Sequence, residues 1–203
     1  MKLICVGRNY AEHAKELKNE VPTEPVIFLK PDTAVLRGNA PFLYPDFSTD
    51  IHHELEVIFQ IGKPGYHIAP EFAVGYVSGI GLGIDFTARD LQTKFKAKGL
   101  PWELAKGFVG SAPISELLPP ERFGPWGQLT LELRVNGETR QQGTTADWLF
   151  PLEQVIAYVS QYYKLLVGDL IFTGTPAGVG PVQVGDRLEG FLNGEKLIDM
   201  RVE

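Results

Sequence analysis

The chain has 203 residues, with 19 Lys and Arg against 25 Asp and Glu, so its formal net charge is −6. An acidic chain without basic clusters argues against a nucleic acid or an anionic membrane as its partner and favours a small molecule. Hydrophobic residues make up 44% and charged residues 22%, which excludes global disorder and fits one domain over residues 1–203 that buries a core without disulfides.

The only cysteine, Cys5, lies in the apolar run 3–6, so an intrachain disulfide is impossible and a reducing compartment fits. That run is too short for a secretion signal, and the sequence contains no stretch of about 18 apolar residues that would span a membrane. We therefore expect a cytoplasmic protein.

Glycine and proline occur throughout, with 22 and 15 residues respectively, which favours short strands and turns over long helices. Asn136-Gly137 and Asn193-Gly194 each lie between strand-like runs, and Asn-Gly tolerates the positive φ that a two-residue hairpin turn needs. We expect a hairpin at each pair. Apolar or alternating runs predict strands over residues 2–6, 26–30, 54–61, 76–85, 128–135, 170–173 and 187–192.

The predicted helices are few and short. A polar helix is expected over residues 10–17. Thr87 is expected to cap a helix over residues 88–98 that Gly99 ends, because Thr before a helix and Gly after it are typical boundaries. Apolar residues at helical spacing predict another helix over residues 151–165. The sequence thus predicts a strand-rich α+β fold.

Three acids are candidate metal ligands. Glu54 and Glu56 stand two residues apart on a predicted strand, so both side chains point to one face. Carboxylates on one face repel each other unless a cation lies between them, and oxygen ligands suit Mg²⁺, Mn²⁺ or Ca²⁺. Asp85 ends the apolar run 80–84, where an acid is costly unless it is paired or binds a metal. The alternatives are a solvated strand face for the glutamates and a helix-capping role for Asp85.

Two further features are candidates for binding an anion. Lys106 has mostly apolar neighbours, where a buried ammonium needs an anionic partner; the alternative is a lysine whose ammonium reaches water. The loop 173–181 follows a predicted strand and is rich in N–H groups and hydroxyls that suit an oxyanion; the alternative is an ordinary glycine-rich turn. The loop lacks the Gly-Lys-Ser/Thr that a P-loop requires.

His13 and Glu16 stand three residues apart on the first predicted helix, a spacing that lets the carboxylate touch the imidazole. A histidine oriented by a carboxylate is a general-base arrangement. The alternative is a surface pair without a catalytic role, and the spacing alone leaves both interpretations open.

Six stretches of the sequence match the motifs of one enzyme family and occur in the same order as in that family. These stretches are residues 7–13, 24–31, 52–56, 85–92, 99–106 and 173–181. With them the chain resembles the fumarylacetoacetate hydrolase (FAH) family over nearly its whole length, and within it the small acylpyruvase and oxaloacetate decarboxylase branch. Departures are small: Gly107 stands where many relatives have Ser, residues 110–113 replace a stretch that often contains Cys, and the chain starts directly at its first strand.

The resemblance implies that Glu54, Glu56 and Asp85 bind Mg²⁺ or Mn²⁺. It makes His13 and Glu16 a catalytic dyad on a mobile lid within residues 1–20. It also implies a mixed β-sandwich or roll and a homodimer. The residues implied to contact the substrate are Arg89, Gln92, Thr175 and Lys106, the last of which also belongs to the catalytic set.

The implied reaction is metal-dependent hydrolysis of a 2,4-diketo acid of the acylpyruvate or fumarylpyruvate type, in which His13 takes a proton from water and pyruvate is released. Oxaloacetate needs only the second half of this chemistry, decarboxylation to the pyruvate enolate. Two alternatives stay open: an isomerase or decarboxylase of aromatic-degradation intermediates, and a non-catalytic dicarboxylate-binding module. The presence of His13 and Glu16 speaks against the binding module, which has no use for a general base.

Overall fold

The computed structural model describes residues 1–16 and 21–203, and the side chains of residues 13–15 lie outside that description. Its central sheet is mixed and has the order β2-β1-β11-β5-β6, in which β1 and β11 run parallel and the other neighbours antiparallel. The sequence predicts each of these strands to within one residue at either end. The strands are β1 (Leu3–Gly7), β2 (Val26–Lys30), β5 (Leu55–Ile61), β6 (Val77–Ile84) and β11 (Leu170–Phe172).

A second, antiparallel sheet has the order β10-β9-β13-β14 and contains both predicted hairpins. Asn136 and Gly137 turn with φ of 53° and 82°, and Asn193 and Gly194 turn with φ of 49° and 79°. A tight hairpin turn requires such left-handed φ at both central residues, so both predictions are confirmed. The strands are β9 (Thr130–Val135), β10 (Glu138–Thr144), β13 (Arg187–Leu192) and β14 (Glu195–Arg201).

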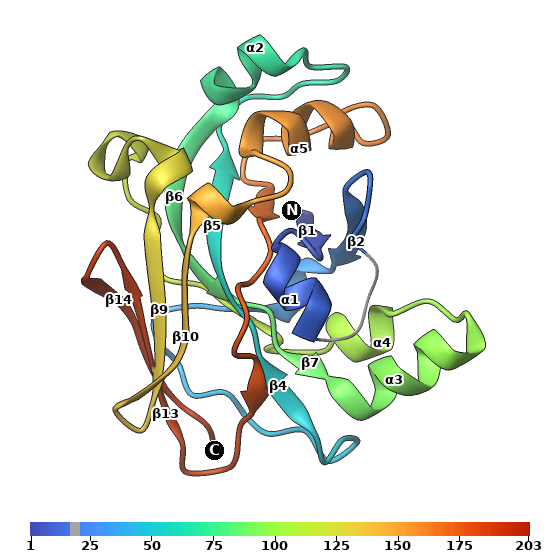
Figure 1. The fold of residues 1–203 in the computed structure, drawn as a ribbon, viewed down its shortest axis with the longest axis vertical. Coiled ribbons are helices and arrows are strands. Elements are labelled where there is room, and N and C mark those ends of the chain that lie inside the picture. The colour runs from blue at the N-terminus through green and yellow to red at the C-terminus, as the bar shows by residue number, and fades with distance from the viewer. Residues whose placement is uncertain (17–20) are drawn as a thin grey trace.

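The two sheets pack against each other and enclose the main core (Figure 1). Gly190 on β13 allows the close approach, because a Cβ at this position would lie 3.3 Å from Leu55 and 3.4 Å from Leu82 of the central sheet. This arrangement confirms the expected strand-rich α+β fold. Fully buried apolar side chains from both sheets fill the interface, among them Ile80, Ile84, Leu133, Leu188 and Leu192.

Short strand pairs position the segments around the ends of β5 and β6. β4 (Ile51–His53) pairs antiparallel with both β12 (Gly180–Pro181) and β7 (Thr87–Ala88). β3 (Val35–Leu36) pairs parallel with β8 (Ala112–Pro113). The sheet formed by β12, β4 and β7 joins the loop 173–181 and the start of α3 to the segment that precedes β5.

The helices are short, as predicted. Thr87 is not the N-cap of α3: it belongs to β7, its hydroxyl donates to the Asp85 carbonyl at 3.2 Å, and Ala88 takes the N-cap position. Gly99 ends α3 with a φ of 63°, as predicted. The α-helices are α1 (Ala11–Glu16), α2 (Pro70–Ala73), α3 (Arg89–Lys98), α4 (Glu103–Lys106) and α5 (Leu152–Val159). The 3₁₀ segments are Asp32–Ala34, Val74–Tyr76, Pro120–Phe123, Trp126–Gln128 and Thr145–Asp147.

α5 ends at Val159 and is shorter than the predicted helix over residues 151–165. Its buried stripe stops there, since Tyr163, one turn further on, is 37% exposed. The Ser160 hydroxyl accepts the N–H of Ile68 at 2.9 Å, which holds the chain where it leaves the helix. Within residues 1–16 and 21–203, no helix has the length and apolar character needed to cross a membrane.

Candidate metal centre and active site

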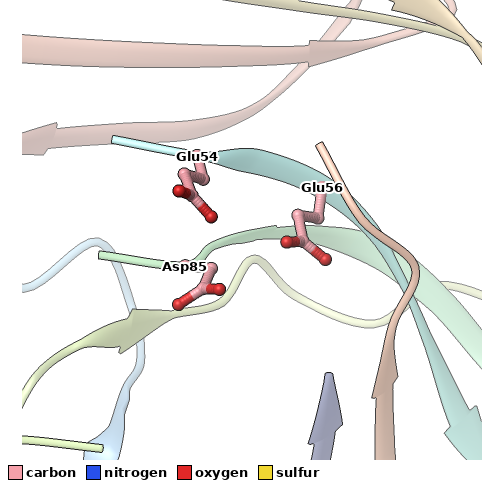
Figure 2. A group of neighbouring side chains, drawn as sticks. All are labelled: Glu54, Glu56 and Asp85. Atoms are coloured by element: carbon pink, nitrogen blue, oxygen red, sulfur yellow. The ribbon is translucent and has the colours of Figure 1, made fainter. Parts of the chain in front are cut away.

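Three carboxylates converge where β5 begins and β6 ends (Figure 2). Glu54 precedes β5, Glu56 lies on it and Asp85 follows β6, and one oxygen from each lies within 4.8 Å of the others. The register of the two strands causes the convergence, because the Asp85 N–H donates to the Glu54 carbonyl at 2.8 Å. The three residues are 5%, 2% and 1% exposed, which excludes a solvated strand face for the glutamates.

Buried basic groups face these acids. The Lys106 ammonium on α4 lies 2.8 Å from Glu54 Oε2 and 2.6 Å from Asp85 Oδ2, and it does not reach water. The Arg89 guanidinium at the start of α3 lies 2.5 Å from Glu54 Oε1. Burial lowers the pKa of Lys106, but Asp85 and Glu54 raise it by more, so the pKa lies above its usual value. Lys106 is therefore a cation at neutral pH.

Lys30, at the end of β2, is a further buried cation that was not predicted from the sequence. Its ammonium lies 2.6 Å from Asp85 Oδ1 and donates to the Ser111 carbonyl at 2.6 Å. The available signal was a lysine that ends an apolar strand, but such a lysine usually reaches water. Two ammonium groups thus hold the two oxygens of Asp85, which excludes a helix-capping role for this acid.

We expect Lys30→Met to lower the free energy of unfolding by about 3–5 kcal/mol, because it removes one partner of a buried ion pair and leaves Asp85 less compensated. Urea denaturation followed by circular dichroism measures the change. Lys94→Met, on the exposed side of α3, is the control and should alter the stability by no more than about 0.5 kcal/mol. A Lys30→Met protein as stable as the wild type would contradict the stabilising role of this ion pair.

Glu56 is supported by the backbone of the glycine-rich loop. The Gly174 N–H donates to Glu56 Oε2 at 2.7 Å, and Gly174 has a φ of 93° that favours glycine. Burial raises the pKa of Glu56 well above its usual value, and the carboxylates of Asp85 and Glu54 raise it further. A cation among the three acids would relieve this repulsion, so the all-carboxylate donor set fits a hard divalent ion.

The residues expected to contact a substrate line one cavity together with the acids. Arg89 Nη1 donates to Gln92 Oε1 at 2.6 Å, so Gln92 orients the guanidinium. Thr175 follows β11, and its hydroxyl donates to the Leu55 carbonyl at 2.7 Å. The cavity is lined by Val6, Gly7, Arg8, Phe28, Glu54, Glu56, Asp85, Arg89, Gln92, Lys96, Trp102, Lys106 and Thr175.

Arg8 is a cavity residue that was not predicted, although it lies within one of the stretches that carry the family resemblance. Its φ is 60°, a left-handed conformation that is uncommon for a residue with a side chain. The next residue, Asn9, holds this turn in place: its side-chain amide donates to the Thr173 carbonyl at 2.8 Å and accepts the Phe150 N–H at 2.8 Å. The turn adds the guanidinium of Arg8 to the other cations along the cavity wall, Arg89, Lys96 and Lys106.

α1 carries the proposed dyad. The Glu16 carboxylate accepts the N–H of Gly178 at 3.1 Å, which joins α1 to the loop 173–181. The His13 side chain lies outside the described part of the structure, so its contact with Glu16 stays a prediction. Residues 17–20, within the expected lid, also lie outside the description.

The family model for the fumarylacetoacetate (FAA) hydrolase C-terminal domain matches residues 2–201. The chain belongs to the fumarylacetoacetate hydrolase family. This confirms both the resemblance seen in the sequence and the FAH-type fold that it implies.

The FAH-family relatives of the chain carry different enzyme names. It is 44% identical over 201 residues to the oxaloacetate tautomerase FAHD1 from Bos taurus, covering 99% of this chain and 91% of the relative. It is 44% identical to an oxaloacetate decarboxylase from Dictyostelium discoideum, with 95% and 89% covered. The crystal structure of fumarylpyruvate hydrolase from Pseudomonas aeruginosa with Mn²⁺ and pyruvate matches with a TM-score of 0.95 and 38% identity, covering 100% of this chain and 89% of that one. The names of these FAH-family proteins all refer to small 2-oxo acids.

Proposed function

We propose that this FAH-family chain is a divalent-metal-dependent enzyme of small 2-oxo acids whose main reaction is the keto–enol tautomerisation of oxaloacetate. The observation that carries the proposal is one cavity that combines three converging carboxylates with the cations Lys106 and Arg89. The sequence alone favoured acylpyruvate hydrolysis. The 44% identity to a protein named oxaloacetate tautomerase, over 99% of this chain, supports placing tautomerisation first.

Glu54, Glu56 and Asp85 would hold Mg²⁺ or Mn²⁺, because both ions prefer carboxylate oxygens. The bound ion supplies a Lewis acid that stabilises negative charge on the 2-oxo group of a substrate. The Mn²⁺ in the complex of the Pseudomonas aeruginosa relative supports this choice.

Tautomerisation moves a proton between C3 and the oxygen on C2, so the protein must hold the substrate and carry that proton. Arg89 and Lys106 bring the positive charges that bind the substrate carboxylates and balance the developing oxyanion. Gln92 keeps Arg89 in place, and Thr175 contacts the substrate from the loop. We assign the proton transfer to an imidazole nitrogen of His13, which takes the proton from C3 and delivers it to the oxygen on C2, or moves it in the reverse direction when the enol is the substrate.

Hydrolysis of acylpyruvates or fumarylpyruvate is the second candidate, with His13 taking a proton from water instead of from C3. The contact of Glu16 with Gly178 fits this reaction as it fits tautomerisation, because it brings the helix carrying His13 against the loop 173–181, here called the substrate loop. The fumarylpyruvate hydrolase of Pseudomonas aeruginosa supports it as well. Decarboxylation of oxaloacetate would use the same cation and Lys106 without a base.

We further propose one catalytic domain over residues 1–203 and a cytoplasmic location, as length and composition predict. The family resemblance adds a lid within residues 1–20 and a homodimer. The lid is supported by α1, whose Glu16 reaches a loop of the site. Light scattering of the purified protein tests the dimer.

The activity test compares the reactions in one preparation. The protein is stripped of metal with EDTA, and then enol-oxaloacetate, an acylpyruvate and keto-oxaloacetate are supplied with and without Mg²⁺ or Mn²⁺. We expect the conversion of enol-oxaloacetate to the keto form, monitored by the loss of enol absorbance, to depend on the metal. Of the reactions compared, this one should have the highest kcat/KM. A higher kcat/KM for acylpyruvate cleavage would make the chain a hydrolase, and metal binding without any turnover would make it a binding module.

A further inference from the structure

Leu55, which separates the two glutamates of the site, lies where β5 loses a neighbouring strand. β11 pairs with β5 only as far as Ile58, so other groups must complete this edge of β5. Side chains do so at Leu55. The Leu55 N–H donates to Gln141 Oε1 at 3.0 Å, and the Leu55 carbonyl accepts from the Thr175 hydroxyl at 2.7 Å. The backbone between the glutamates is therefore held by two side chains.

Gln141 on β10 is 1% exposed and uses all four hydrogen-bonding positions of its amide. Oε1 accepts from Leu55 and, at 2.9 Å, from Nδ1 of His53. Nε2 donates to the Thr175 hydroxyl at 2.7 Å and to the Pro176 carbonyl at 3.0 Å. The two backbone partners fix the orientation of the amide, because an N–H only donates and a carbonyl only accepts. His53 therefore carries its proton on Nδ1.

β10 is shaped so that Gln141 points into the protein. The pairing of β10 with β9 shifts register between Thr139 and Gln141, and such β-bulges change the direction of side chains. The substrate loop packs directly on this bulge, since a Cβ on Gly178 would lie 2.2 Å from the Arg140 carbonyl oxygen. The loop 173–181 thus rests on β10 and on β5, and Gln141 joins the two contacts.

We propose that Gln141 is a positioning residue that holds the metal-binding glutamates and the substrate loop in one arrangement. The inference rests on the proposed function, because it assigns Gln141 to that metal and substrate site. One amide fixes the backbone between Glu54 and Glu56 and also the hydroxyl of Thr175. Loss of Gln141 therefore disturbs metal binding and substrate binding together, although Gln141 is not among the residues that line the cavity.

The first test is Gln141→Leu, which removes all four hydrogen bonds with little change in volume. Titration calorimetry with Mn²⁺ should show binding weakened by about tenfold or more, as is usual when the groups that orient metal ligands are lost. Binding of pyruvate to the Mn²⁺-loaded protein should weaken as well. The control is Gln142→Leu on the same strand, where the side chain is exposed; it should bind both as the wild type does.

Gln141→Glu separates the two sides of the amide and fits the same space if the leucine variant fails to fold. It keeps oxygen acceptors for Leu55 and His53 but loses both donors of the amide, the one to the Thr175 hydroxyl and the one to the Pro176 carbonyl. Mn²⁺ binding should not weaken, whereas pyruvate binding should weaken by about tenfold or more, because two hydrogen bonds that hold the loop are lost. If Gln141→Glu binds pyruvate as tightly as the wild type, the proposal is overturned. The proposal is also overturned if Gln141→Leu binds Mn²⁺ as tightly as the wild type, even when that variant melts at a lower temperature.

The affinity measurements keep this inference separate from the proposed function. A wild-type protein that binds Mn²⁺ and pyruvate but turns over no 2-oxo acid would contradict the proposed activity and leave the comparison of the Gln141 variants valid. An active wild type whose Gln141 variants keep both affinities would contradict only the positioning role.

Discussion

Glu56→Gln is expected to abolish metal-dependent activity and to weaken Mn²⁺ binding by at least about 100-fold, because changes next to metal ligands alone cost 10–100-fold and this change removes a ligand charge. The amide has the same shape, and its oxygen can still accept the N–H of Gly174, so the loop contact is retained. Titration calorimetry and the ketonisation rate measure the two effects. The loss of Mn²⁺ affinity and of activity would then be caused by the missing negative charge.

Two observations separate this effect from a folding defect. In EDTA, Glu56→Gln should melt no lower than the wild type, because it removes a buried charge that Asp85 and Glu54 repel. Glu103→Gln, an exposed acid on α4, is the matched control and should keep both affinity and activity. Mn²⁺ affinity equal to that of the wild type in Glu56→Gln would exclude Glu56 from the ligand set.

The sequence predicts those parts of the molecule that depend on neighbours in the chain. Strand periodicity located the central strands, and Asn-Gly pairs located both hairpins. The spacing of Glu54 and Glu56, together with an acid at the end of an apolar run, identified all three members of the acidic group. These signals succeed because a strand has a fixed side-chain period and because a buried acid is costly wherever it occurs.

The remaining parts of the site depend on contacts between residues far apart in the chain. In the sequence, Lys30 is an ordinary lysine at the end of a strand, and only the fold brings its ammonium to Asp85. Gln141 has the sequence pattern of a surface residue, and only the bulge on β10 turns its side chain inward. Thr87 was misassigned as a helix cap because its pairing in β7 with β4 is a tertiary contact. Periodicity carries no information on such pairings, and a polar residue on a predicted strand is assigned to solvent by default.

The roles of His13 and Lys106 can be separated by reactions that differ in their need for a base. His13→Ala should lower kcat for tautomerisation and for acylpyruvate hydrolysis by about 10²–10⁴-fold, the usual contribution of a positioned general base. Decarboxylation of oxaloacetate should fall much less, because CO₂ leaves without prior removal of a proton. The three rates are measured with one preparation at saturating Mn²⁺, by enol absorbance, acylpyruvate loss and CO₂ release.

Lys106→Met is the matched comparison, since every one of these reactions develops enolate charge that the ammonium balances. It should lower all three rates together, whereas Glu16→Ala should lower hydrolysis more than decarboxylation, because Glu16 is expected to orient His13. The ratio of the losses in kcat/KM is the decisive quantity, because a step shared by two reactions cancels in it. For each variant, the loss in kcat/KM for hydrolysis is divided by the loss for decarboxylation. If this ratio agrees for His13→Ala and Lys106→Met within a factor of about two, or about 0.4 kcal/mol, both residues act on the shared step and His13 is not the base.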